Sequence, residues 1–239
     1  FIDNLSGLNL GLFDTLSFNH SMPWTPSTTG SYVVEIWASN LDGNIDLNST
    51  NDTFSDTIYI WNNIAVRTPL IETFTSSTCG PCAPANVTAE ALFSQNLGRF
   101  TSIKYQADFP MPGDPYYTLE GGNRRSYYAV SSVPRMEIDG GWDQNGGNIT
   151  QQILDDHINE VSFINLSANY LITSKTVDVD ITIDPFENIQ SNNLVVHVAV
   201  VEETTYNNIK TNGETQFEHV VKKMLPNDNG TSISSLTAG

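Results

Sequence analysis

The alternation of apolar and polar residues divides the chain into three zones. Before residue 62 and after residue 162, short runs place an apolar side chain at every second position, which is typical of strands with one buried face. Asn-, Asp- and Gly-rich turns separate these runs, as in a sandwich of antiparallel sheets. The strands predicted in the two outer zones are 14–18, 32–38, 53–60, 163–173, 176–184 and 193–202.

The middle zone mixes strands with helices. The β-prone run Leu70–Thr75 is followed by a small polar turn and then by a helical pattern that ends before Gly98. A second amphipathic helix is expected at 150–161, with Thr150 as its N-cap. A strand is predicted at 100–106, a partly helical segment at 116–130, and a helix or bent strand at 216–225.

The only two cysteines, Cys79 and Cys82, lie at the predicted junction between strand and helix. A helix N-terminus offers unpaired N–H groups and the positive end of the helix dipole, so a thiolate at a partly exposed Cys79 would be stabilised. Cys82 lies one turn further along, where it could attack a mixed disulfide formed on Cys79. The spacing therefore predicts a dithiol–disulfide exchange unit.

These residues resemble the active site of the thioredoxin superfamily, which has a Cys-Gly-Pro-Cys after a central strand. The segment 131–140 resembles the same family's Val-cis-Pro turn. The resemblance implies a cis bond before Pro134 and a substrate-binding role for Val133 and Pro134, beside catalytic Cys79 and Cys82. Two residues depart from the family: Thr78 replaces a tryptophan, and Thr73 stands where a buried acid is expected.

Composition narrows the possible partners. The chain has 27 acidic and 10 basic residues, a formal charge of −17, which argues against nucleic acid and against an anionic membrane surface. No apolar run in the sequence is long enough to span a membrane. The wealth of Thr, Ser, Asn and Gly suggests an exported β-rich protein. Arg124 and Arg125 are candidates to stabilise a Cys79 thiolate, although solvated or surface-paired arginines are more common.

One loop carries a weak calcium pattern. Asp42, Asn44, Asp46 and Asn48 place oxygen ligands at every second residue, as calcium loops do. The glycine and the twelfth-position acid of an EF-hand are missing, and such runs are also ordinary loop chemistry between strands. Calcium is the only cofactor that the sequence suggests.

Over residues 67–230 the order of motifs resembles the bacterial family called outer membrane protein twenty-eight. That resemblance implies an α/β thioredoxin-like core flanked by antiparallel β-sandwich, immunoglobulin-like segments, on an exported, surface-associated protein. The expected domains are a partial immunoglobulin-like domain at 1–62, a thioredoxin-like domain at 67–161, and a C-terminal sandwich at 162–239, expected to be incomplete.

Three functional hypotheses follow. The first is a secreted thiol–disulfide oxidoreductase that acts on polypeptide thiols or disulfides through Cys79 and Cys82. The second is a surface or adhesive scaffold with a static Cys79–Cys82 disulfide. The third is an assembly in which sheet edges pair with other surface proteins or with copies of the same chain. All three place the protein outside the cell, at its surface or at the outer membrane.

Overall fold

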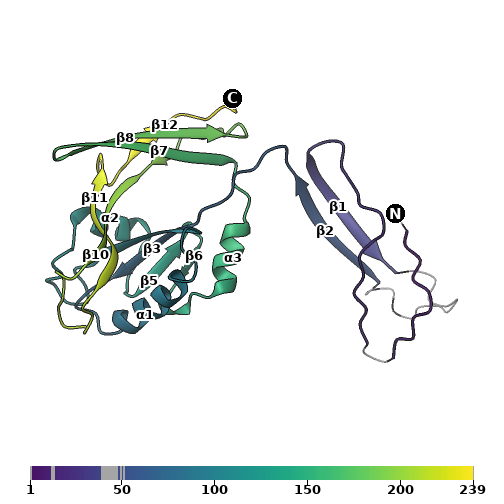
Figure 1. Ribbon diagram of the computed structural model, residues 1–239, viewed down its shortest axis with the longest axis horizontal. Coiled ribbons are helices and arrows are strands. Elements are labelled where there is room, and N and C mark those ends of the chain that lie inside the picture. The colour runs from purple at the N-terminus through teal and green to yellow at the C-terminus, as the bar shows by residue number, and fades with distance from the viewer. Residues whose placement is uncertain (1, 12–13, 39–47, 49, 51, 239) are drawn as a thin grey trace. The chain divides into compact units, whose positions relative to one another are not determined.

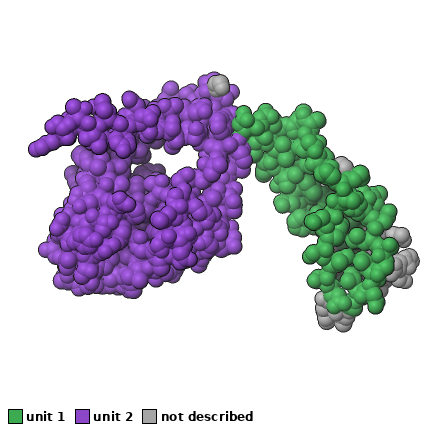
Figure 2. All heavy atoms as spheres, in the orientation of Figure 1, with its two compact units in different colours: residues 1–63 green, residues 64–239 purple. Residues whose placement is uncertain are grey.

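The computed structural model describes residues 2–11, 14–38, 48, 50 and 52–238. They fall into two compact units, residues 1–63 and 64–239 (Figure 2). In the first unit β1 (Gly30–Trp37) and β2 (Thr53–Ile60) form an antiparallel pair with Gly30 opposite Ile60. The strand predicted at 14–18 is wrong, because these residues adopt no regular structure.

A six-stranded mixed sheet forms the centre of the second unit (Figure 1). Its order is β10-β11-β4-β3-β5-β6, and β3 is parallel to β4 and antiparallel to β5. The cysteine segment follows the C-terminal end of β3. The strand bounds are β3 (Leu70–Thr75), β4 (Thr101–Gln106), β5 (Arg135–Ile138), β6 (Trp142–Gln144), β10 (Val198–Thr205) and β11 (Phe217–Leu225).

Helices cover both faces of this sheet. On one face α1 (Cys82–Phe93) and α3 (Gln151–Asn159) pack their apolar side chains against β3 and β5, with Phe93 and Leu154 in the same buried cluster as Ile71. The other face has a second cluster around Phe74 and Tyr105, beside α2 (Leu119–Tyr127). Thr150 caps α3 by accepting a hydrogen bond from the Ile153 N–H, as the sequence predicts. A short 3-10 turn, η1 (Gly146–Asn148), precedes α3.

Two further sheets of the second unit have only two strands each. The hairpin of β7 (Ile164–Thr173) and β8 (Thr176–Pro185) is the long ribbon above the central sheet in Figure 1. The short strands β9 (Leu194–Val196) and β12 (Thr231–Ile233) pair with one another. The single strand predicted at 193–202 is therefore divided, since β9 and β10 belong to different sheets.

The predicted fold class, an α/β thioredoxin-like core flanked by β-sandwiches, is wrong. The described residues are mainly β-strand, with three short α-helices, one mixed sheet and three two-stranded antiparallel sheets. The physical reason is that β10 and β11 extend the central sheet through β4 and close no sandwich of their own. The strands predicted at 32–38, 53–60, 163–173 and 176–184 form two-stranded ribbons whose described residues are mostly exposed. Alternation shows that one face of a strand is apolar, but it does not show what covers that face.

Candidate functional site

The site is built where the buried strand β3 turns into α1. Ser76, Ser77 and Thr78 form the turn, the N–H of Cys79 donates to the carbonyl of Ser76, and the N–H of Cys82 donates to the carbonyl of Cys79. Cys79 and Cys82 are joined by a disulfide, with their Cα atoms 5.3 Å apart. The helix begins at Cys82, so Cys79 precedes it by three residues, whereas the sequence predicts Cys79 at the helix N-terminus and Cys82 one turn further along.

Both cysteines are buried. Cys79 is 1% exposed and Cys82 is 0% exposed. The expectation of a partly exposed Cys79 is therefore wrong. A sulfur atom must be reached by an attacking thiolate before exchange can take place, so this burial limits what the pair can do in the closed structure.

Val133 and Pro134 lie beside the disulfide, and their peptide bond is cis, as the resemblance implies. The sulfur of Cys79 is 3.7 Å from the carbonyl oxygen of Val133. This contact is not a hydrogen bond, because a disulfide sulfur carries no proton. In the reduced protein, however, the same carbonyl could accept a bond from the Cys79 thiol.

The proline-rich segment 108–115 is fastened over the turn by a buried carboxylate. Asp114 Oδ2 accepts hydrogen bonds of 2.8 Å from both the N–H and the hydroxyl of Ser77. On the exposed side of the turn, the Thr78 hydroxyl donates to the carbonyl of Met111 over 2.8 Å. Nothing local in the sequence indicates that Asp114 binds the Ser77 turn.

A second covering segment comes from the loop between β10 and β11. The N–H groups of Thr211 and Asn212 both donate to the carbonyl of Ser77, and the Asn212 side chain donates to the carbonyl of Ser76. The Asn86 amide of α1 binds Glu214 of the same loop over 2.7 Å. These contacts join residues more than 120 positions apart, so sequence alone gives no signal for them.

The N-terminus of α1 has fewer free donors than an ordinary helix. Pro81 is its N-cap residue and Pro84 is its third residue, and neither has an N–H. The first turn contains no acidic or basic side chain, and the N-cap makes no side-chain hydrogen bond. The stabilisation of an anion at Cys79 is therefore weaker than the position alone suggests.

Arg124 does not face the cysteines. Its guanidinium makes a bidentate ion pair with buried Glu72, with N–O distances of 2.7 and 2.9 Å, and the hydroxyls of Tyr105 and Tyr128 complete the shell of that carboxylate. Burial would raise the pKa of Glu72, but these bonds, chiefly those of Arg124, lower it below its usual value. Arg125 donates to the carbonyl of Val130. The hypothesis that these arginines stabilise a Cys79 thiolate is therefore wrong.

The predicted calcium residues Asp42, Asn44 and Asp46 lie outside the described residues, whereas Asn48 is one of the described residues. A different group of possible ligands, Asp139, His157 and Glu160, has its ligand atoms within 4.8 Å of one another. Arg67 occupies this position, with N–O distances of 3.1 Å to Asp139 and 3.3 Å to Glu160. Its guanidinium supplies the positive charge that a metal would bring.

Comparison with known proteins finds a protein of similar structure but no matching family. No family model matches the chain, and no curated protein matches it. The structure is similar to the crystal structure of a protein from Agrobacterium tumefaciens, with a TM-score of 0.50 and 16% identity, over 73% of this chain and 77% of that one. Identity this low indicates likeness of fold alone. Among the described residues no helix is long and apolar enough to cross a membrane.

Proposed function

We propose that this is an exported, surface-associated bacterial protein with a non-enzymatic scaffold role, and that its Cys79–Cys82 disulfide is a static part of the fold. The observation that carries this proposal is the burial of both sulfurs, 1% and 0% exposed by residue. Exchange needs a thiolate to approach one sulfur along the S–S axis. The segments 108–115 and 211–214, bound to the Ser76–Ser77 turn, oppose that approach.

Local electrostatics also favour a static pair. A Cys79 thiolate would lie against the carbonyl oxygen of Val133, and the carboxylate of Asp114 binds Ser77, which precedes Cys79 by two residues. A carbonyl dipole and a nearby negative charge both disfavour a thiolate. With Pro81 and Pro84 reducing the donors of α1, the opposing stabilisation is small.

The proposed location rests on chemistry and on resemblance. Disulfides persist in oxidising compartments outside the cytosol. The composition, with few lysines and arginines and many short polar side chains, is that of an exported β-rich chain. The motif order shared with the outer membrane protein twenty-eight family supports the same location.

The β7–β8 hairpin supports a role in assembly. One face of the hairpin is apolar: it carries Leu166, Ala168, Tyr170 and Ile172 of β7 and their four apolar partners on β8. The other face is mostly polar. The apolar face is largely uncovered, and Tyr170 is 73% exposed. We propose that it packs against the same face of a second copy. This arrangement would keep Asp178, Asp180 and Asp184, which lie on the polar face, away from the partner.

Disulfide exchange is the second candidate. It is favoured by one specific observation, the contact of Cys79 with the carbonyl beside the cis Val133–Pro134 bond at the start of a helix. On this alternative, the segment 108–115 would have to move away before a substrate could reach Cys79.

Turnover of a test disulfide separates the two candidates. The purified protein is mixed with an insulin disulfide and excess dithiothreitol, beside Cys79→Ser and Cys82→Ser variants. The scaffold proposal expects no acceleration over dithiothreitol alone and no mixed disulfide trapped by Cys82→Ser. Turnover that disappears in Cys79→Ser would establish the alternative.

A further inference from the structure

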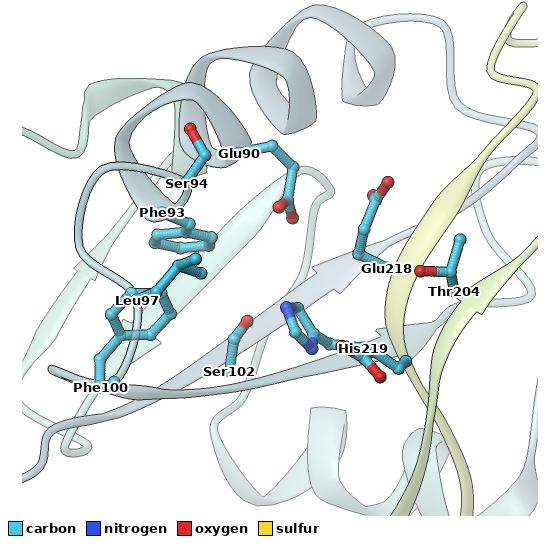
Figure 3. A pocket seen from close by; sticks show the side chains of 11 residues that line it. Glu90, Phe93, Ser94, Leu97, Phe100, Ser102, Thr204, Glu218 and His219 are labelled. Carbon is cyan, nitrogen blue, oxygen red and sulfur yellow. The ribbon is translucent and has the colours of Figure 1, made fainter.

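A pocket of about 310 Å³ opens on the α1 side of the central sheet (Figure 3). It lies between the C-terminal end of α1, the loop to β4, and the strands β10 and β11. The loop side of the pocket is apolar and the strand side is acidic. The apolar lining includes Phe93, Leu97 and Phe100, and the acidic lining consists of Glu90, Glu203 and Glu218.

The acidic side has more negative than positive charge. Lys104 is buried beneath it, with its Nζ atom 2.6 Å from Glu90 and 3.7 Å from Glu218. One ammonium thus faces two carboxylates, which leaves one negative charge uncompensated even before Glu203 is counted. Pockets with low-dielectric walls focus such a potential and favour a cationic ligand.

A buried hydroxyl points into the pocket without a partner. Ser102 is 7% exposed, and within the described part of the chain its Oγ atom makes no hydrogen bond. Figure 3 shows it between Phe100 and His219. The alternation of β4 turns Ser102 and Lys104 toward α1, while Ile103 and Tyr105 face the opposite layer. An unpaired buried hydroxyl destabilises the fold, so a ligand that hydrogen-bonds it gains from binding there.

A second hollow of about 620 Å³ shares Glu90 and Glu218 with the first. It continues along α1 past Val87 and Ala91 and contains Glu214. Burial raises the pKa of Glu214, and the negative charge of Glu218 raises it further, in spite of hydrogen bonds from Asn86 and Asn212 and the charge of Lys104. Because the two hollows share Glu90 and Glu218, they form one groove along α1, with these carboxylates at the middle of it.

We propose that this groove binds the ammonium end of an unbranched alkylamine, presented either by a free diamine or by a lysine side chain of a peptide. The alkyl chain would lie against Phe93, Leu97 and Phe100. The ammonium would bind Glu203 and Glu218 and donate a hydrogen bond to Ser102 Oγ. An anionic ligand would be repelled by the same carboxylates. A volume of about 300 Å³ is at the small end of ligand pockets, which suits a chain of a few methylenes.

Isothermal titration of the full chain tests this inference with 1,5-diaminopentane and with Nα-acetyl-lysine methylamide, using 1-pentanol as the uncharged control. Saturable binding of at least one amine is expected, with weakening as salt is added. Glu203→Gln and Glu218→Gln should each weaken it about five- to tenfold. Glu187→Gln makes the same charge change at an exposed position outside the groove and should leave the affinity unchanged.

Ser102→Ala distinguishes binding from folding. Because the hydroxyl has no partner among the described residues, its removal should leave thermal stability equal or higher, yet amine affinity should fall several-fold.

Binding by the diamine alone would assign the site to free amines, and binding by the lysine amide alone would assign it to peptide side chains. Absence of saturable binding by both, equal binding of 1-pentanol, or equal weakening by Glu187→Gln would overturn the inference.

Discussion

The sulfur of Cys79 lies 3.7 Å from the carbonyl oxygen of Val133, although 54 residues separate them in the chain. This contact brings the two motifs of the sequence together at the end of β3. It also determines the environment of the sulfur, because a carbonyl oxygen stabilises a thiol and destabilises a thiolate. The juxtaposition found here is therefore compatible with a disulfide that stays closed.

Asp114 should control access to that disulfide. In Asp114→Asn the bonds from the Ser77 N–H and hydroxyl lose their charged acceptor, so we expect a loss of about 1–3 kcal/mol in unfolding free energy and faster reduction by dithiothreitol. Urea unfolding and timed thiol alkylation measure the two effects. Asp108→Asn is the matched control, since exposed Asp108 accepts a hydrogen bond from the N–H of Gly113 within the same segment. Equal effects in both variants would contradict this role of Asp114.

The ion pair of Glu72 with Arg124 should be strongly coupled. Arg124→Met leaves a buried carboxylate without its cation, which should cost about 3–5 kcal/mol. The double variant Glu72→Leu with Arg124→Met should recover most of that loss, because no unpaired charge remains. Arg125→Met removes an arginine of the same helix that donates to the Val130 carbonyl and has no ion pair among the described residues, so it should cost less. Additive losses in the double variant would exclude the coupling.

Stability should fall with pH because of Glu137. Burial, a hydrogen bond with Asp143 on the neighbouring strand and the charge of Asp143 together raise the pKa of Glu137 to about 7. The folded state thus holds a proton that the unfolded chain has lost, so the contribution of Glu137 to stability declines between about pH 4.5 and 7. Glu137→Gln should remove this decline. The unfolding free energy of the variant, relative to that of the native chain, should therefore rise by about 1–3 kcal/mol from pH 4.5 to pH 8. Parallel pH profiles of the two proteins would show that Glu137 does not titrate in this range.

Self-association should depend on one face of the β7–β8 hairpin. Tyr170→Lys places a charge on the apolar face, whereas Asn169→Lys places the same charge on the polar face of the same strand. Light scattering during gel filtration should show a dimer for the native chain and for Asn169→Lys, and a monomer for Tyr170→Lys. A native chain that remains monomeric at all concentrations would contradict the proposed assembly.

The sequence predicts elements whose signals are local. The alternation over 53–60 and the β-prone run at 70–75 give both strands their observed bounds, and Thr150 is an N-cap because a cap needs only its own helix. A helix after the cysteine motif and the cis Val133–Pro134 bond also agree with expectation, although the helix begins three residues later than predicted, at Cys82.

Features that depend on tertiary contacts are not predicted. Cys79 is buried, and the segments 108–115 and 211–214 are bound to the neighbouring Ser76–Ser77 turn by long-range hydrogen bonds that their own sequence does not indicate. The partner of Arg124 is a residue 52 positions away. The sandwiches fail for a related reason. The alternation of β10 is equally compatible with a separate sheet and with the extended central sheet that forms, and 216–225, predicted as a helix or bent strand, is the strand β11 that joins β10 to β4.

The most direct test of the static disulfide is its rate of reduction as a function of urea. The protein is exposed to dithiothreitol at several urea concentrations below the unfolding transition, and free thiols at Cys79 and Cys82 are alkylated and counted by mass spectrometry. Because the closed fold buries both sulfurs, we predict negligible reduction without urea and a rate that rises in parallel with the population of opened molecules. Rapid reduction in the absence of urea, with no dependence on its concentration, would contradict the account.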